Sequence, residues 1–245
     1  MFFRNERGAT TLVEALVAMI LTLLIGYAVF SALFSAGRGV QGQQSQASST
    51  GELRQALSLL ESQIGKTTLP LAYVSANGNE IAFVYPQDPN ALSGQYYCVR
   101  YAVVDNSGLR TDGTGALIEQ SVLITPSGGN NTSASTDCAY DVTHGTAGLT
   151  ADASLTPSSG LNVVSQLSNG STRAFTPVDN SCFINLNGIT TSFNPATCPL
   201  ATAPLSPGAG LLVNLIANPN IIVGNNRQGS LSNLQSVDYI NFASH

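Results

Sequence analysis

A run of twenty residues without a charge constrains this chain more than any other feature of its sequence. The run extends from Ala15 to Phe34 and consists mainly of Leu, Ile, Val, Ala and Phe. As an α-helix it spans about 30 Å, which matches the hydrocarbon thickness of a bilayer. A soluble helix this apolar on every face would need burial on all sides, which a chain of this size hardly provides. The sequence therefore predicts one membrane-spanning helix.

The residues before this run predict its orientation. Arg4 and Arg7 precede it, and Glu6 is the only opposing charge among residues 1–9. The positive-inside rule places these residues in the cytoplasm, so the rest of the chain is exported. Three alternatives compete: a cleaved secretory signal, a plain signal anchor, and a leader followed by a retained helix. A secretory signal has a shorter apolar region with a small-x-small site after it, and residues 35–37 match that site poorly.

The segment from Gly8 to Glu14 reads Gly-Ala-Thr-Thr-Leu-Val-Glu. It resembles the class III signal of type IV prepilins and pseudopilins, which a prepilin peptidase cuts just before the apolar helix. A cut after Ala9 makes Thr10 the first mature residue and Glu14 the fifth, which is the family's position for Glu. A cut between Gly8 and Ala9 is the alternative, and it makes Glu14 the sixth. The chain departs from the family pattern at two positions, with Ala9 in place of Gly before the cut and Thr10 in place of Phe directly after it.

Glu14 also stands out on physical grounds. A carboxylate at the edge of an apolar span is costly unless it is paired, neutralised or close to the interface. The family resemblance implies that it faces the new N-terminal amine of a neighbouring subunit, which makes it a subunit-assembly residue. An ordinary interfacial glutamate near the cytoplasmic headgroups is the alternative.

Beyond the apolar run, the sequence predicts a helical half outside the membrane. One apolar stripe recurs at spacings of four, three and four residues and is expected to lie against a sheet. Its members are Leu53, Leu57, Leu60 and Ile64. Four polar residues are expected to point elsewhere: Glu52, Arg54, Glu61 and Gln63. Three glycines between the halves are expected to allow a hinge: Gly37, Gly39 and Gly42.

After Pro70, short apolar runs separated by turn residues predict β-strands. Asn77-Gly78 is suited to a tight hairpin turn, because both residues tolerate positive φ. Strands are expected at 71–75, 80–85, 95–104, 116–124, 161–167, 183–186, 211–217 and 237–242. Residues 126–160 and 187–210 are rich in Ser, Thr, Gly and Pro, and they are expected to form loops.

The chain has four cysteines with no C-x-x-C pair: Cys98, Cys138, Cys182 and Cys198. Four cysteines in an exported domain fit two disulfides with three possible connectivities, and we favour Cys98 with Cys138 and Cys182 with Cys198. Four free thiols in a cytosolic protein are the alternative. With two histidines, a zinc site or haem attachment has no sequence support.

Charge and motifs exclude several functions. Charged residues make up 9% of the chain, with net charge -5 and Lys66 as the single lysine, so no basic face is expected to bind nucleic acid. The dinucleotide-like pattern at residues 37–42 follows a membrane helix and not a strand. Asp105 and Asp112 bracket a loop that fails calcium-loop spacing, and a solvated turn is expected. We expect no enzyme activity, cofactor or metal.

The predicted fold class is α+β and pilin-like: a long N-terminal helix packed on an antiparallel sheet with disulfide-containing loops. We expect a leader at residues 1–9, a transmembrane half-helix at 10–36, an extramembrane half-helix at 37–69 and a β-rich head at 70–245. The resemblance covers residues 1–65 well. Within the family, Tyr96-Tyr97-Cys98-Val99-Arg100-Tyr101 and, after a turn, Leu117-Ile118-Glu119 are most similar to PilW-type minor pilins.

The resemblance implies a minor pilin that takes part in pilus assembly. Its expected partners are the inner membrane, the prepilin peptidase, other major and minor pilins, and a tip adhesin. Two alternatives remain: a J-type minor pseudopilin of type II secretion, and a single-pass anchored periplasmic binding domain.

Overall fold

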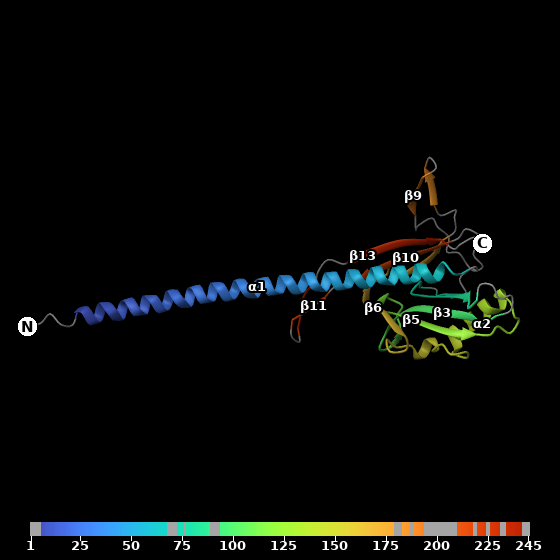
Figure 1. Ribbon diagram of the computed structural model, residues 1–245, viewed down its shortest axis with the longest axis horizontal. Helices are drawn as coiled ribbons and strands as arrows, with labels where there is room; N and C mark the ends of the chain where they lie inside the picture. Colours follow the sequence, from blue (N-terminus) through green and yellow to red (C-terminus); the bar gives the residue numbers. More distant parts are fainter. Residues whose placement is uncertain are drawn as a thin grey trace, which may run out of the picture. The chain divides into compact units, whose positions relative to one another are not determined.

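The computed structural model describes residues 6–67, 73–75, 77–88, 94–178, 183–186, 189–193, 210–217, 220–223, 226–230 and 234–241. The chain forms two compact units, residues 1–45 and residues 46–245. The fold is α+β and pilin-like, with one long N-terminal helix, an antiparallel sheet and a disulfide. Figure 1 labels both α-helices and several of the strands.

Helix α1 runs from Glu6 to Ile64 and therefore contributes to both units. It stays helical through Gly37, Gly39 and Gly42, so the expected hinge is not a break in the helix. Gly65 follows the end of the helix, and its amide donates to the carbonyl of Glu61 at 2.9 Å.

The larger unit is built on one sheet of nine strands, and every pairing within it is antiparallel. Its main path runs β1-β2-β3-β5-β6-β10-β13, with β4 paired to β3 and β7 paired to β10. The strands are β1 (Tyr73–Val74), β2 (Glu80–Pro86), β3 (Tyr96–Asp105), β4 (Gly108–Leu109), β5 (Thr114–Ile124), β6 (Leu161–Ser168), β7 (Phe175–Val178), β10 (Gly210–Ala217) and β13 (Leu234–Asn241).

Two separate hairpins complete the strands of this unit. One consists of β8 (Phe183–Leu186) and β9 (Ile189–Phe193), and the other of β11 (Asn220–Val223) and β12 (Asn226–Ser230). The first hairpin corrects the expectation of a loop over residues 187–210, because β9 lies in that range. Its Ile-Thr-Thr-Ser-Phe sequence combines β-branched and aromatic residues, which favour strands.

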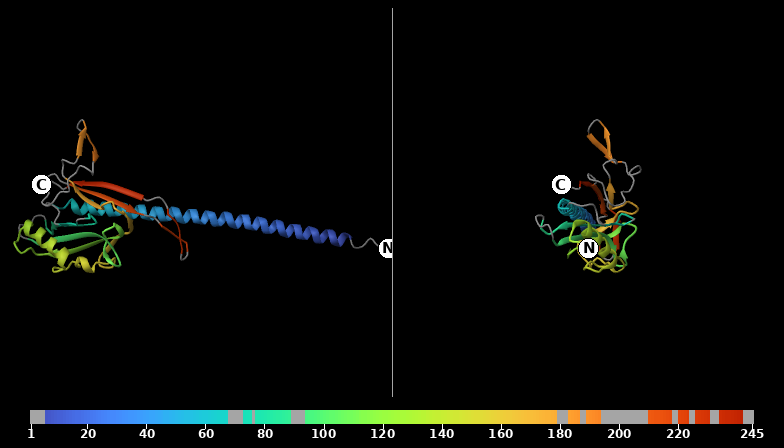
Figure 2. Two further views of the ribbon diagram at one scale, coloured as in Figure 1. Left: turned by 180° about the vertical axis from the view of Figure 1, so that it is seen from behind. Right: turned by 90° about the vertical axis from the view of Figure 1, so that its right-hand side faces the viewer.

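Alternation along the central strand β3 gives the sheet two different faces. Val99, Tyr101 and Val103 belong to the core cluster that contains the end of α1, and we call their side the inner face. Cys98 and Ala102 belong to two smaller clusters on the opposite side, the outer face. Helix α2 (Asn131–His144) packs there, and Figures 1 and 2 show it across β3 and β5 from the end of α1.

The predicted helical stripe is confirmed on the inner face. Its residues are buried in one core cluster with side chains of β2, β3, β5, β6, β7, β10 and β13, and Ala56 joins them between the predicted positions. The buried stripe is Leu53, Ala56, Leu57, Leu60 and Ile64. Burial of each leucine or isoleucine contributes about 1.5–3 kcal/mol, so this stripe is a principal reason why the helix end docks on the sheet.

The polar residues beside the stripe depart from expectation, because three of the four bond to the sheet. A hydrogen bond between Glu61 and Asp238 of β13 raises the pKa of Glu61. Glu52 accepts hydrogen bonds from the backbone amide and hydroxyl of Ser165, at 2.9 and 2.8 Å. Gln63 donates to Glu119 at 2.7 Å and accepts from the Tyr101 hydroxyl at 2.8 Å. A side chain at the margin of a buried stripe is close enough to reach the sheet, which sequence spacing alone does not reveal.

Strands β1 to β6 form one half of the sheet, and β7, β10 and β13 form the other. The two halves are joined by a narrow junction between β6 and β10. Strands β6 and β10 pair only through Leu167 and Ala217 in the described register. The side chain of Asn169, which is 3% exposed, extends this junction. It donates to the carbonyl of Asn214 at 2.6 Å and accepts from the amide of Ile216 at 2.8 Å. One buried amide therefore satisfies backbone groups of β10 where ladder pairing stops.

The hairpin predicted at Asn77-Gly78 is confirmed. Gly78 has φ of 70° and its amide donates to Ser75 at 2.9 Å, while β1 and β2 pair on either side. An added Cβ at Gly78 would lie 2.6 Å from the carbonyl oxygen of Phe175, so both conformation and space require glycine there.

Candidate functional site

The apolar part of α1 in the first unit has no cover from that unit. Its large apolar side chains are at least half exposed, from Val13 at 58% to Val40 at 63%. The exposed set comprises Val13, Leu16, Val17, Met19, Ile20, Leu21, Leu23, Leu24, Ile25, Tyr27, Val29, Phe30, Leu33, Phe34 and Val40. A continuous apolar surface of this kind marks contact with lipid or with another protein.

Within the described residues, one helix is long and apolar enough to cross a membrane, and its apolar window has no buried share. This confirms the predicted span at the level of length and composition. Thr22 is polar, but its hydroxyl donates to the carbonyl of Ala18 at 2.7 Å, so its polar group is satisfied within the helix.

The predicted processing and assembly residues all lie in this part of α1. Gly8, Ala9 and Thr10 are in its first turns, and their side chains are outside the described part of the structure. Glu14 is exposed and immediately precedes the uncharged run. Cleavage at Ala9-Thr10, or at Gly8-Ala9, stays a prediction, as does the assembly role of Glu14.

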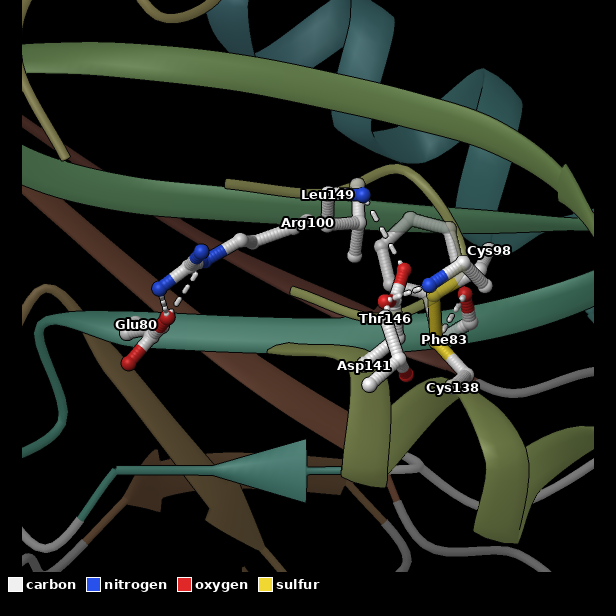
Figure 3. The surroundings of a disulfide bond; sticks show 9 residues. Glu80, Phe83, Cys98, Arg100, Cys138, Asp141, Thr146 and Leu149 are labelled. Atoms are coloured by element: carbon white, nitrogen blue, oxygen red, sulfur yellow. Dashed lines mark hydrogen bonds and ion pairs between the residues drawn. A yellow bond between two sulfur atoms is a disulfide. The ribbon is translucent and has the colours of Figure 1, made fainter. Parts of the chain in front are cut away.

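The second candidate region is the outer face of the sheet, where Cys98 of β3 is bonded to Cys138 of α2 (Figure 3). Both cysteines are fully buried and their Cα atoms lie 5.5 Å apart. The bond closes a separation of 40 residues and has the pairing that we favoured. Cys182 and Cys198 lie outside the described residues, so their pairing stays a prediction.

Helix α2 and the short turn η1 (Asp152–Ser154) correct the prediction that residues 126–160 form a loop. Asn130 caps the helix by accepting from the amide of Ser133, and Gly145 ends it with φ of 68°. The helix buries Ala134, Cys138 and Val142, spaced four residues apart. That spacing was the missed signal, and it is weak because serine, threonine and asparagine surround it.

The loop after α2 is held by the carboxylate of Asp141, which is fully buried. Its oxygens accept from the amide of Leu149 at 3.0 Å, from the hydroxyl of Thr146 at 3.3 Å, and from the amide of Ala147. Figure 3 shows these groups beside the disulfide. A buried charge is stable here because several donors replace its water shell.

A buried ion cluster lies beside the disulfide-linked helix. Arg100 of β3 is fully buried and forms ion pairs with Glu80 of β2 and Asp152 of η1. It also donates to the carbonyl of Thr150 at 2.6 Å. One arginine therefore connects the sheet to the loop that covers it, a role that bidentate guanidinium geometry suits.

The pKa of Glu80 is shifted by its position in this cluster. Its pKa is raised to about 7, chiefly by burial; Arg100 opposes this rise and Asp152 adds to it. One carboxyl oxygen, Oε2, is buried without a hydrogen-bond partner among the residues that the structure describes. The sequence does not predict this cluster, because its charged residues are at positions 80, 100 and 152, which are too far apart along the chain to form a motif.

The remaining motifs receive structural assignments. Asp105 and Asp112 both form ion pairs with Arg110, so the two carboxylates of this turn bind a guanidinium group of the same chain. The described part of the chain contains no group of three His, Cys, Asp or Glu residues suited to a metal ion. His144 stacks on Tyr140, with ring centroids 4.0 Å apart. Residues 37–42 are helical in α1, and His245 lies outside the described residues.

Comparison of the chain with models of protein families, with curated proteins and with solved structures finds no match.

Proposed function

We propose that this chain is a minor type IV pilin, which a prepilin peptidase processes and which enters a pilus or primes its assembly. One observation carries the proposal: the apolar, uncovered first part of α1 continues as one helix into a second part that docks on an antiparallel sheet. A plain membrane anchor does not need to share a helix with its domain, whereas a filament subunit needs a helix that serves both packing and support.

The apolar helix has two environments in this proposal. Before assembly it lies in the inner membrane, with residues 1–9 in the cytoplasm and the head in the periplasm. In the filament, the same exposed side chains pack against the helices of neighbouring subunits. Both environments bury an apolar surface that the first unit leaves open.

Glu14 gives the proposal its mechanism. A carboxylate beside lipid is costly, and a free N-terminal amine a few residues away on a neighbouring helix would neutralise it. Cleavage before Thr10 creates such an amine. Processing and Glu14 then act together to position the subunit during assembly.

The first experiment is intact mass and N-terminal sequencing of the protein from membranes, with and without an active prepilin peptidase. We expect a peptidase-dependent mature start at Thr10, with Ala9 as the alternative start. An uncut chain that begins at Met1 would contradict the proposal and would leave a membrane-anchored domain.

A second experiment separates assembly from processing. Glu14→Ala should lower the amount of protein in sheared filaments, while the mature chain accumulates in the membrane. Thr22→Ala is the matched control, because it removes a polar group from the same span without removing a charge. Equal incorporation of Glu14→Ala, Thr22→Ala and unchanged protein would exclude the assembly role of Glu14. Recovery with secretion components in place of pilus components would favour the pseudopilin alternative.

A further inference from the structure

The outer face contains a buried charge arrangement that the proposed function does not use. Two carboxylates, Glu80 and Asp152, share a single guanidinium, that of Arg100. Glu80 and Arg100 are fully buried, and the side chain of Asp152 is 29% exposed. With both carboxylates ionised, the cluster carries one net negative charge in a largely dehydrated site, which is costly.

The orphan oxygen of Glu80 shows where this imbalance lies. Oε1 accepts from Arg100, whereas Oε2 has no hydrogen-bond donor among the described residues. An ionised carboxylate in this position leaves half of its hydrogen-bonding capacity unused, while a protonated carboxyl group needs fewer donors. The geometry thus favours one bound proton in the cluster.

The elements around Glu80 offer no second cation. Tyr73 of β1 and Asp152 of η1 face it together with Arg100, and burial followed by the charges of Glu80 and Asp152 raises the pKa of Tyr73. On the neighbouring strand β5, Gln120 donates to Thr150 and Ser159. Arg100 is therefore the single cation that acts on this carboxyl group in the described structure.

The cluster also holds the cover of the outer face. Arg100 bonds to Thr150 and Asp152, which lie just before Leu155. Leu155 is 1% exposed and packs on a small apolar cluster with Ala102, Val104, Ala116 and Ile118. Helix α2 is attached separately by its disulfide. Loss of the contacts of Arg100 would loosen residues 150–155, which would keep the hydrogen bond from Gln120 to Thr150 and the packing of Leu155, while α2 stays in place.

We propose that Glu80, Arg100 and Asp152 form a proton-dependent latch, in which one bound proton keeps residues 150–155 closed over the outer face. When the proton leaves, the excess negative charge is relieved by departure of Asp152, the partly exposed and loop-borne member. The apolar cluster under Leu155 then becomes accessible. The latch is closed in acid and loosens toward neutral pH.

The direction and range of the pH response follow from Glu80. Its pKa is about 7 in the closed state, against an ordinary value of 4.5. Between these values the closed state binds more protons than an open, hydrated state, so the closed state loses stability as pH rises through this range. Above the closed-state pKa of about 7, the closed and open states bind the same number of protons, so the stability of the closed state no longer changes with pH.

Amide hydrogen exchange of the full chain in detergent micelles tests the latch, with rates corrected for intrinsic pH dependence. The reporters are the amides of Ser154 and Leu155, which donate to Ala151 and Asp152. We expect their protection to fall by up to about tenfold per pH unit between roughly pH 5 and pH 7, and to stay constant above. Constant protection across this range would overturn the proposal.

Three variants assign the effect. Glu80→Gln places a permanent N–H donor where the protonated acid has its O–H, so protection should lose its pH dependence. Asp152→Asn removes the second carboxylate, so the midpoint should move to lower pH. Asp105→Asn changes a partly exposed carboxylate that pairs with Arg110, and it should keep the original profile. An unchanged slope in Glu80→Gln would exclude the latch, and if that variant does not fold, an unchanged midpoint in Asp152→Asn would do so.

Discussion

The two faces of the head sheet are covered by helices that use different chemistry. On the inner face, α1 packs a continuous aliphatic stripe on the strands. On the outer face, α2 buries Ala134, Cys138 and Val142, and a disulfide and buried charges supply the remaining attachments. A long apolar stripe docks a helix by area alone, whereas a short polar helix needs covalent and ionic links at particular positions.

This difference predicts which face of the head opens first. Local opening begins where few apolar contacts oppose it, and the outer face has fewer of them. Loss of an inner-face contact should therefore destabilise the whole head, while loss of an outer-face contact should act locally. The following predictions are ordered from the largest expected effect to the smallest.

The largest effect is expected from Leu60→Ala on the inner face. Leu60 is fully buried between α1 and the sheet, so its truncation should lower the free energy of unfolding by about 2–5 kcal/mol. Urea unfolding followed by circular dichroism measures this change. Ser62→Ala, an exposed site on the same helix, is the control. A loss of structure confined to α1, with the sheet still folded, would contradict the expectation that an inner-face contact stabilises the whole head.

The second effect concerns the disulfide of the outer face. Replacement of Cys98 and Cys138 by alanine removes a link over a separation of 40 residues, which corresponds to about 2–4 kcal/mol. Because α2 has few other apolar anchors, exchange protection should fall first in residues 131–144. Hydrogen exchange resolved by peptide checks this. If α1 and α2 lost protection equally, the two faces would not be independent.

A smaller effect is expected from Asn130→Ala at the start of α2. The substitution removes the acceptor for the amide of Ser133 and should cost about 1 kcal/mol. Combined with loss of the disulfide, it should melt α2 further than either change alone, since both act on the same helix. A double-mutant comparison by hydrogen exchange measures the coupling, and strict additivity would argue against a common unit.

The smallest effect is expected from Glu52→Gln at the margin of the inner face. The carboxylate accepts two hydrogen bonds from Ser165, but the pair is exposed, so the loss should be only about 0.5–1 kcal/mol. Thermal unfolding alongside Leu60→Ala compares the polar margin with the apolar stripe directly. If Glu52→Gln cost as much as Leu60→Ala, docking of α1 would not be dominated by apolar area.

Much of the inner face could be predicted from the sequence because its signals are local. Leucine and isoleucine at helical spacing define one buried side of α1, and Asn-Gly between two apolar runs defines a hairpin. The strands β2, β3 and β5 follow from the same reasoning, within a few residues at their ends. In the candidate site, the uncharged run and the carboxylate of Glu14 could likewise be identified from the sequence.

The outer face could not be predicted in the same way, because its partners are distant in sequence. Helix α2 has poor intrinsic helix formers, and its stability depends on a cap, a glycine end and a bond to β3. The cluster of Arg100 joins three elements, and its charges are too far apart along the chain to form a motif. Asn169 similarly joins β6 to β10 only after the sheet has assembled.

The sequence by itself determined a single apolar helix, the β-rich head and the stripe that joins them, since hydrophobic periodicity is a local property of a chain. Only the tertiary structure decided which residues lie on the outer face, how the 126–160 segment folds, and that a carboxyl group with a pKa of about 7 lies there. Burial and charge proximity depend on the assembled sheet, which brings positions 80, 100 and 152 together.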